Sequence, residues 1–444
     1  MKNKSKCKPL WITLGAAAAC LAVAGGIFAM SSEMTGVKAQ AEALYPKMSP
    51  YPDQNVYVEE NYDNWWEDRN AQLDQPEGYA DSLWSFYGDS IRTYLSGSGN
   101  SAYSPVNLYM ALSVLAETTD GNSRSQILDL LGADSVEGLR TQAGQVWNAN
   151  YCDDGALTSV LANSVWLDKG TEFHADTLKL LAQHYYASAY TGKFGTDEMN
   201  SAIRSWLNEQ TGGFLADAVR NVEPDPETVF ALYSTVYFKA RWDNEFDKAL
   251  NTQGVFHAPG GDVEREFMNK TQTWGRYLYG EDFGAVQLGF KTGCSMWLIL
   301  PDEDKDVNAV LDSGEYMQMI KEPNNWSKVK SLRINLSLPK FDVSSDFDLK
   351  SGLSELGVTD VFSPEHADFS PICDDPLVVG KAKQSARVQI DEEGCTAASF
   401  VEMEVCGASM PPEEEMDLTF DRPFIFVITG MDGQPLFAGT VFEP

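Results

Sequence analysis

The sequence predicts one domain of the α+β class over residues 77–444. Helical patterns lie mostly in the first part of this region, and strand patterns lie mostly in the second. A protein built from βαβ units would alternate the two patterns, and the sequence shows neither that alternation nor an internal repeat. With 43% hydrophobic and 22% charged residues, the chain has the composition of a globular protein rather than a disordered one.

The helices are predicted from apolar spacing and from capping residues. Residues 79–95 place large apolar side chains at intervals of three and four. Ser104 followed by a proline is typical of a helix start. A capping box at Ser123 predicts the start of another helix, which Gly132 would end. A shorter helix is expected over residues 348–356.

The strands are predicted from alternation and from apolar, β-branched runs. Residues 332–338 alternate apolar with polar side chains, as expected for a strand with one buried face. Five further segments have strand character: residues 228–239, 285–300, 377–391, 424–429 and 436–442.

Residues 1–30 have the pattern of an export signal. Four lysines within the first eight positions precede 22 uncharged residues. That run is also long enough to span a bilayer, so we expect either a cleaved signal peptide or a retained membrane anchor. The body of the protein is therefore expected to be extracellular or on the cell surface. Residues 31–76 are predicted to be a flexible spacer, with a partly docked arm as the alternative that Trp65 and Trp66 favour.

The charge and the missing motifs exclude several functions. With 65 acidic and 33 basic residues the net charge is −32, which disfavours nucleic acid and limits membrane contact to the N-terminal segment. No cofactor or metal site is predicted, because the four histidines are scattered and the seven cysteines contain no C-x-x-C pair. The sequence also lacks the G-x-S-x-G, H-E-x-x-H and Walker motifs, so we predict that the protein is not an enzyme. We also expect a monomer.

Residues 392–413 form an unusual connection between two predicted strands. Connections of this length are uncommon in compact domains and are usually functional. Every second residue is small or apolar, as in a strand with one buried face: Cys395, Ala397, Ser399, Val401, Met403 and Val405. Gly407 and the two prolines that follow favour an exposed end instead. The segment thus has the features of both a loop and a strand, although an ordinary strand followed by a turn remains the alternative.

Several motifs, in order along the chain, resemble those of the serpin family of serine protease inhibitors. They are Ser104-Pro105, Asn163-Ser-Val-Trp166, Val236-Tyr-Phe-Lys-Ala-Arg-Trp242, Leu338-Pro-Lys-Phe341, Glu392-Glu393-Gly394 and Phe420-Asp-Arg-Pro-Phe424. The resemblance implies a serpin fold with three β-sheets, about nine helices and an exposed reactive-centre loop.

The resemblance also implies a mechanism for the unusual connection. A serine protease attacks the loop and forms an acyl-enzyme, and the cut loop then inserts into the central sheet and distorts the protease. The spacing of the family places the reactive bond between Ala408 and Ser409. A small apolar residue at Ala408 suits the shallow primary pocket of elastase-like or subtilisin-like proteases.

Two further groups of residues follow from the resemblance. The loop hinge comprises Glu392, Glu393, Gly394, Cys395, Thr396, Ala397, Ala398 and Ser399. The sheet-opening region comprises Ser104, Asn107, Ser234, Gln384 and Trp242. Gln384 stands where the family commonly has a histidine, and its amide can donate and accept in the same network. The alternative function is a non-inhibitory serpin-fold binding or surface protein, in which bulky or charged hinge residues are expected.

Overall fold

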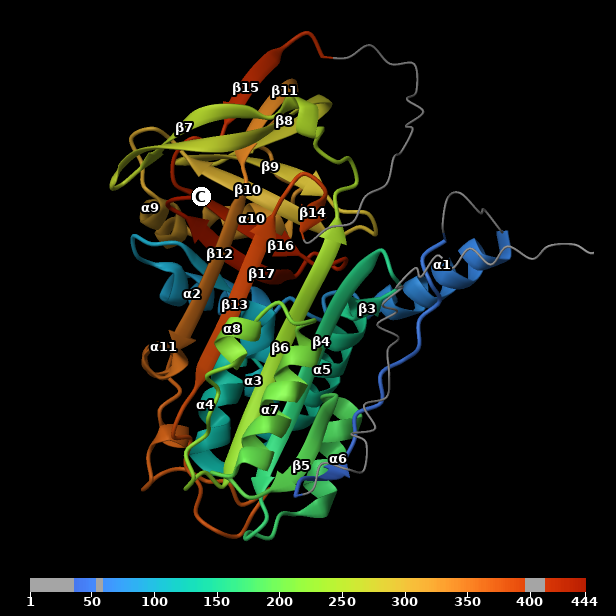
Figure 1. The fold of residues 1–444 in the computed structure, drawn as a ribbon, viewed down its shortest axis with the longest axis vertical. Coiled ribbons are helices and arrows are strands. Elements are labelled where there is room, and N and C mark those ends of the chain that lie inside the picture. The colour runs from blue at the N-terminus through green and yellow to red at the C-terminus, as the bar shows by residue number, and fades with distance from the viewer. Residues whose placement is uncertain (1–35, 53–58, 396–411) are drawn as a thin grey trace, which may run out of the picture.

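A long central sheet carries the functional part of the molecule (Figure 1). The computed structural model describes residues 36–52, 59–395 and 412–444. Within them the central sheet has eight strands in the order β1-β5-β4-β6-β14-β13-β12, with β3 paired to β4. The strands are β1 (Lys38–Ala41), β3 (Cys152–Asp153), β4 (Leu157–Asp168), β5 (Ala187–Gly192), β6 (Phe230–Arg241), β12 (Phe341–Asp348), β13 (Lys383–Ile390) and β14 (Gly394–Cys395).

A second sheet has nine strands in the order β15-β11-β8-β9-β10-β16-β17-β2, with β7 paired to β8. The long strand β8 joins two groups of strands, because it pairs with β9 at two residues only, Leu278 and Tyr279. The three expected sheets are therefore the central sheet and these two groups. The strands are β2 (Ser101–Tyr103), β7 (Thr252–Ala258), β8 (Gly261–Tyr279), β9 (Phe283–Gly289), β10 (Ser295–Pro301), β11 (Val329–Pro339), β15 (Glu415–Thr419), β16 (Phe424–Thr429) and β17 (Pro435–Val441).

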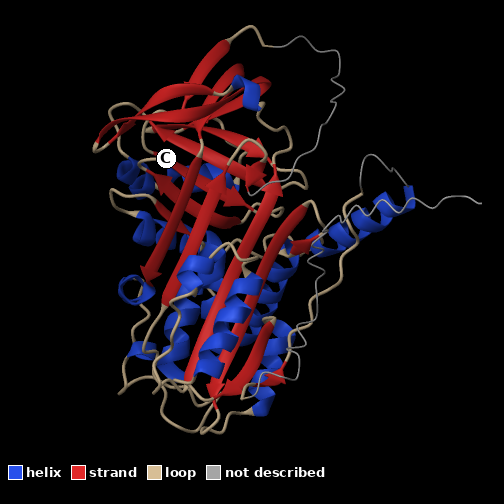
Figure 2. Cartoon of the chain, viewed as in Figure 1, coloured by secondary structure: helices blue, strands red, loops and turns tan. Residues whose placement is uncertain are grey.

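The described residues contain eleven α-helices, where about nine were expected (Figure 2). The helices are α1 (Glu59–Leu73), α2 (Leu83–Leu95), α3 (Pro105–Thr118), α4 (Gly121–Leu131), α5 (Val136–Asn150), α6 (Ala175–His184), α7 (Asp197–Gln210), α8 (Ala216–Val219), α9 (Val307–Ser313), α10 (Glu315–Lys321) and α11 (Leu349–Glu355). Two 3₁₀ helices are also present, η2 (Lys248–Leu250) and η3 (Asp360–Phe362).

Strand β4 shows why both faces of the central sheet are covered. Leu161 and Val165 belong to the main hydrophobic core. Ala162 and Trp166 have the opposite parity and pack with Trp206 and other residues of α7 in a second core. The central sheet therefore lies between two layers of helices.

The predicted helix caps are partly confirmed. Helix α3 begins at Pro105, and the Ser104 hydroxyl accepts a hydrogen bond from the Asn107 amide. Gly132 ends α4 with a φ of 64°. The capping box at Ser123 was wrong, because α4 begins at Gly121 and the buried Ser123 hydroxyl instead accepts from the Asp368 amide. The local pattern assigned Ser123 to a helix cap, whereas in the folded protein its side chain bonds a distant loop.

The described part of residues 31–76 packs against the domain as the docked-arm alternative expects, and does not form the predicted spacer. Strand β1 pairs with β5 at the edge of the central sheet. Tyr45 stacks on Trp147 at 5.6 Å, and the buried Trp65 donates a 2.9 Å hydrogen bond from Nε1 to Asp154. Aromatic burial and strand pairing together stabilise the docked arrangement. Among the described residues, no helix is long and apolar enough to cross a bilayer, and the predicted signal at residues 1–30 lies outside that set.

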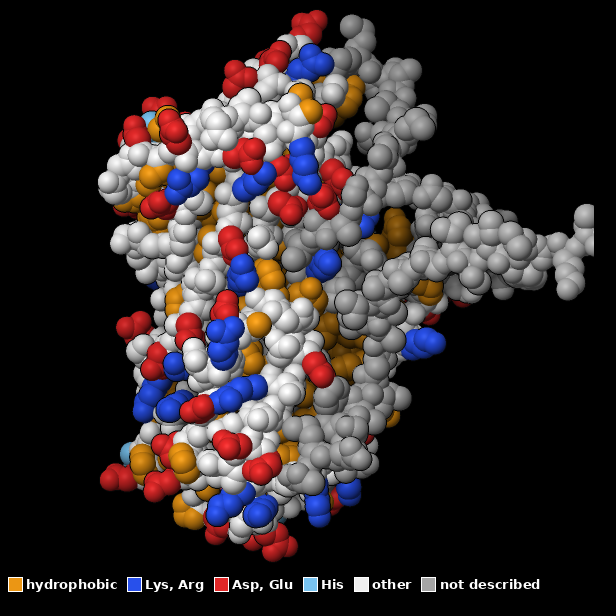
Figure 3. All heavy atoms as spheres, viewed as in Figure 1, with side chains coloured by type: hydrophobic (Ala, Val, Ile, Leu, Met, Phe, Trp, Pro, Cys, Tyr) orange, Lys and Arg blue, Asp and Glu red, His pale blue; other side chains and the backbone are white. Residues whose placement is uncertain are grey.

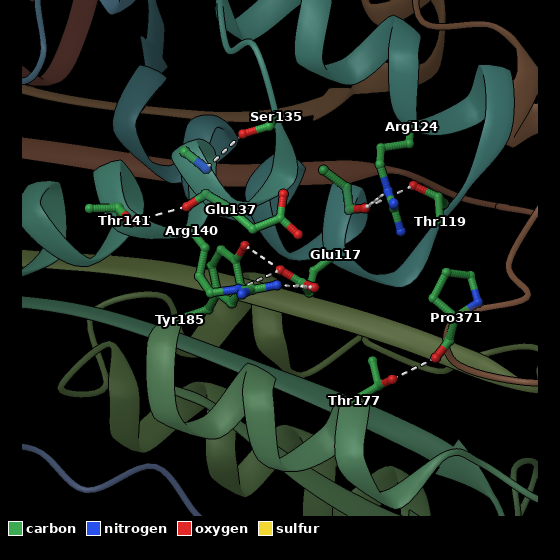
Figure 4. A network of polar contacts seen from close by, with 12 residues as sticks. Glu117, Thr119, Arg124, Ser135, Glu137, Arg140, Thr141, Thr177, Tyr185 and Pro371 are labelled. Carbon is green, nitrogen blue, oxygen red and sulfur yellow. Dashed lines mark hydrogen bonds and ion pairs between the residues drawn. The ribbon is translucent and has the colours of Figure 1, made fainter.

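A buried ion pair connects the helices on one side of the central sheet (Figure 4). Arg140 of α5 donates two hydrogen bonds, of 2.9 and 3.1 Å, to the carboxylate of Glu117 at the end of α3. The Tyr185 hydroxyl donates a third at 2.8 Å, and the Tyr185 carbonyl accepts from Asn163 of β4. The buried carboxylate is thus fully paired, and it connects the helical layer to the sheet.

Candidate functional site

The central sheet is interrupted between β6 and β13. Within the described ranges, these strands share no ladder of hydrogen bonds, and the two-residue strand β14 is the one element between them. Cys395 of β14 is opposite Ala240 on one side and Ile390 on the other. Beyond β14 a cavity of about 20 Å³ lies between residues 236–238 of β6 and residues 385–388 of β13. We call this gap the strand slot.

The inner face of the strand slot is apolar. On β13, Ala386, Val388 and Ile390 are buried, and the residues between them are partly exposed. Cys395 is 4% exposed and points to the same inner side. The sequence predicts Cys395 as the first member of the inward set, and the other members of that set lie outside the described residues. Figure 3 shows the other side of the central sheet, which faces the viewer, and there acidic and basic side chains intermix around hydrophobic side chains in the middle.

Glu392 and Glu393 close one end of the strand slot, and we call these two residues and their partners the hinge anchor. The buried Glu392 carboxylate accepts from Lys340 Nζ at 2.7 Å and from Asn251 Nδ2 at 2.5 Å. Lys248 Nζ lies 2.9 Å from the Glu393 carboxylate. The backbone is held as well, because the Phe246 amide donates to the Glu392 carbonyl at 2.9 Å.

Electrostatics favour the charged form of Glu392. Burial by itself would raise the pKa of this carboxyl group. The hydrogen bonds from Lys340 and Asn251 outweigh burial, and the pKa of Glu392 lies below its ordinary value of 4.5. Lys340 also bonds Glu266, and its two carboxylate partners raise the pKa of its ammonium group against the effect of burial. The hinge anchor is therefore an ion-pair site above acidic pH.

Gly394 is required by both its conformation and its surroundings. Its φ of 149° is one that side chains disfavour. A Cβ atom there would lie 2.3 Å from the Ala240 carbonyl oxygen and 2.8 Å from the Arg241 Cα. The chain can therefore turn into the strand slot at this position only with glycine.

Trp242 lies at the hinge anchor and does not join the other predicted sheet-opening residues. Its indole Nε1 donates to the Asp391 carbonyl at 2.9 Å, and its amide donates to the Glu393 carbonyl at 3.1 Å. The ring stacks on Phe290 at 4.6 Å with an interplanar angle of 9°. The structure thus places Trp242 as a support of the hinge backbone.

The other four residues of that prediction meet at a polar site, the sheet-opening cluster. Gln384 Nε2 donates to Asn107 Oδ1 at 3.1 Å, and Asn107 Nδ2 donates to Ser234 Oγ at 3.1 Å. Gln384 also bonds the Ser104 backbone on both edges of its amide, at 2.8 and 2.9 Å. Through α3 this network bridges β13 and β6, the two sides of the strand slot. The sequence matched Gln384 and Ser234 to the family's polar pair with Asn107 nearby, whereas in the structure Gln384 bonds Asn107 directly and Asn107 bonds Ser234.

Six of the predicted site residues lie outside the described residues: Thr396, Ala397, Ala398, Ser399, Ala408 and Ser409.

Four residues that bond Glu392 or Glu393 were not predicted: Lys340, Asn251, Lys248 and Phe246. Lys340 belongs to the Leu338–Phe341 motif, which was the one available signal for it. Asn251 is 141 residues from Glu392 in the sequence, and no local pattern connects them.

The geometry has close parallels in known proteins. The model of the family described as "Serpin (serine protease inhibitor)" matches residues 86–444. Alpha-1-antiproteinase 2 of Equus caballus is 29% identical over 360 residues, which cover 79% of this chain and 82% of that protein. Serpin-ZX of Arabidopsis thaliana is 28% identical over 376 residues, which cover 80% and 94%.

Solved structures agree with the sequence relatives. The thermophilic serpin tengpin in its native state has a TM-score of 0.73 at 25% identity, over 90% of this chain and 98% of that one. Human thyroxine-binding globulin has a TM-score of 0.71 at 21% identity, over 85% and 99%, a likeness of fold alone. Since the family model covers most of the chain, the protein belongs to the serpin family.

Proposed function

We propose that the protein is an irreversible, suicide-substrate inhibitor of serine proteases. The observation that carries this proposal is the strand slot: among the described residues β6 and β13 share no ladder of hydrogen bonds, and β14 already places two residues of a strand between them. A sheet with unpaired strands on both sides of a gap gains a full ladder of hydrogen bonds when a segment enters it. The free energy of that pairing is what would drive insertion of the cut loop.

The register of β14 assigns the following residues to positions in the strand slot. If the ladder continues from Cys395, Ala397 enters between Phe238 and Val388, and Ser399 enters between Val236 and Ala386. These positions face the apolar inner side, where small side chains fit without clashes. Ala398 would face outward. The small hinge residues therefore suit insertion, which favours an inhibitor over a non-inhibitory binding protein.

The proposed target is an elastase-like or subtilisin-like protease that cuts between Ala408 and Ser409. A methyl side chain at Ala408 fits a shallow primary pocket, whereas a trypsin-like pocket requires a cation. The export pattern of residues 1–30 supports a protease encountered outside the cytoplasmic membrane, by a monomeric inhibitor that is either released or anchored.

The test is the formation of a covalent complex. The full mature chain is mixed with an elastase-like and a subtilisin-like protease, and we expect a complex that survives SDS. Ala408→Arg should shift capture to trypsin-like proteases, and capture of elastase-like enzymes alone by this variant would contradict the assigned bond. Cleavage without any complex would support the non-inhibitory alternative.

A pair of hinge variants tests the register of insertion. Ala397→Arg places a charge on the apolar inner side, so we expect this variant to be cleaved as a substrate without trapping the protease. Ala398→Arg carries the same change on the outward side and should still form the complex. Equal behaviour of the two variants would contradict the register.

A further inference from the structure

Lys270 of β8 has contacts that neither the hinge anchor nor the sheet-opening cluster explains. Its Nζ donates a 2.6 Å hydrogen bond to the Asn244 carbonyl and lies 4.4 Å from the centre of the Phe246 ring. The side chain is half-buried between β8 and the segment that connects β6 to η2. A desolvated ammonium over an aromatic face is held more tightly than one in water.

Phe246, which Lys270 contacts, also contacts the hinge anchor. Its amide donates to the Glu392 carbonyl at 2.9 Å, and its ring meets the Trp242 ring edge-on at 6.1 Å. The Trp242 amide in turn donates to the Glu393 carbonyl. The backbone at which the loop begins is therefore positioned by a segment that Lys270 holds from behind.

We propose that Lys270 is a positioning residue whose terminal amine holds Asn244–Phe246 and thereby orients the backbone that receives Glu392 and Glu393. Its importance for inhibition rests on the proposed function, because the hinge anchor would then be the pivot of loop insertion. The positioning itself requires no protease and can be measured without one.

The charge of Lys270 can be removed at a mild pH. Burial lowers its pKa from 10.5 to about 8, and Asp243 offsets part of that effect. Other charged groups facing this segment are Glu245 on it, Arg241 on β6, Lys291 on the β9–β10 turn, and Lys248 and Glu393 at the hinge anchor. Variants must therefore be compared at equal pH, so that the contributions of these groups cancel.

Two observables should rise together above pH 8. The unfolded chain keeps the Lys270 proton to near pH 10.5, whereas the folded chain releases it near pH 8, so the contribution of Lys270 to global stability should increase above pH 8. Opening of the Asn244–Phe246 segment returns Lys270 to water, so by the same linkage protection of the Phe246 amide should also rise above pH 8. A lysine that does not hold this segment would leave the protection of Phe246 unchanged.

Amide hydrogen exchange at Trp242 and Phe246 tests the proposal in the full chain, after correction for intrinsic rates. Between pH 7 and pH 9 we expect protection in the unsubstituted protein to rise about tenfold, and protection in Lys270→Met to change by less than about twofold. Lys270→Arg should keep its protection at both values. A ratio between the unsubstituted protein and Lys270→Met that is equal at pH 7 and pH 9 would overturn the proposal.

The unsubstituted protein provides a second test if a variant fails to fold. Between pH 7 and pH 9 protection of its Phe246 amide should rise about tenfold. Protection that stays constant over this range would count against Lys270. If the exchange results agree with expectation but no protease complex forms at any pH, the inhibitor assignment fails and the positioning role stands.

Discussion

The two ends of the strand slot are held closed by different chemistry. At the hinge anchor the buried Glu392 is paired with Lys340 and supported by Asn251. At the sheet-opening cluster, Gln384 and Asn107 connect the two sides through neutral amides and hydroxyl groups. Protonation and salt weaken an ion pair, whereas neutral hydrogen bonds respond to neither. The two ends should therefore open independently when solution conditions change.

The largest effect is expected at the turn into the strand slot. Gly394→Ala forces a methyl group onto the Ala240 carbonyl and a side chain into a positive-φ conformation. We expect a loss of about 3 kcal/mol in the free energy of unfolding of the uncleaved chain, measured by urea denaturation. Gly380→Ala is the matched control, since a Cβ there meets nothing within 4 Å. Equal stabilities of the two variants would refute the close approach at Gly394.

Substitution in the sheet-opening cluster should lower the free energy of unfolding by an amount that does not depend on pH. Gln384→Leu leaves the Asn107 side-chain oxygen Oδ1 and the polar Ser104 backbone without a partner, so we expect a loss of about 2 kcal/mol in the free energy of unfolding that is constant from pH 5 to pH 8. Gln389→Leu is the same change on the same strand, at a residue of the opposite parity, and should cost little. Gln384→His should make this end titrate near neutral pH. A pH-dependent loss in Gln384→Leu would contradict the neutral character of the cluster.

Substitution in the hinge anchor should lower the free energy of unfolding somewhat less, and by an amount that depends on salt concentration. Glu392→Gln removes the ion pair with Lys340, for an expected loss of about 1.5 kcal/mol at low ionic strength, measured by thermal and urea unfolding. Glu266→Gln is the control, because it removes the more exposed carboxylate from the same lysine and should cost less stability. If the two changes have equal effects, burial does not distinguish the two carboxylates.

Acid titration sharpens the comparison. Because the folded pKa of Glu392 lies below 4.5, its contribution is fully present above that pH and is lost as the pH falls through the folded value. The stability difference between the unsubstituted protein and Glu392→Gln should thus be constant above pH 5 and shrink below pH 4.5. A difference that grows on acidification would mean that burial, not Lys340, controls this carboxyl group.

The smallest effect concerns the inserted state. The register of β14 would bring Val401 between Ser234 and Gln384, where its side chain offers no hydrogen bond. We expect Val401→Thr to stabilise the loop-cleaved form by about 1 kcal/mol and to leave the uncleaved form unchanged. Val405→Thr, farther along the same face, should stabilise neither form. Calorimetry of cleaved and uncleaved samples makes both measurements.

Local pattern accounts for much of the fold. The predicted strand at residues 424–429 is β16, and the alternation at 332–338 lies within β11. Ser104 and Gly132 bound their helices because capping depends on neighbouring residues alone. The inward parity of Cys395 followed from the same kind of reasoning, since alternation fixes which side chains share one face of a strand.

The sequence by itself therefore determined the α+β class, the serpin motifs, the grouping of Ser104, Asn107, Ser234 and Gln384, and the inward parity of Cys395. Only the tertiary structure decided that residues 36–52 dock on the sheet, that Ser123 bonds a distant loop, and that Lys340 and Asn251 pair with Glu392. The physical reason is the distance along the chain over which each interaction acts. Caps and alternation are set within a few residues, whereas a buried carboxylate takes its partners from whichever distant strands the completed sheets bring within hydrogen-bonding distance.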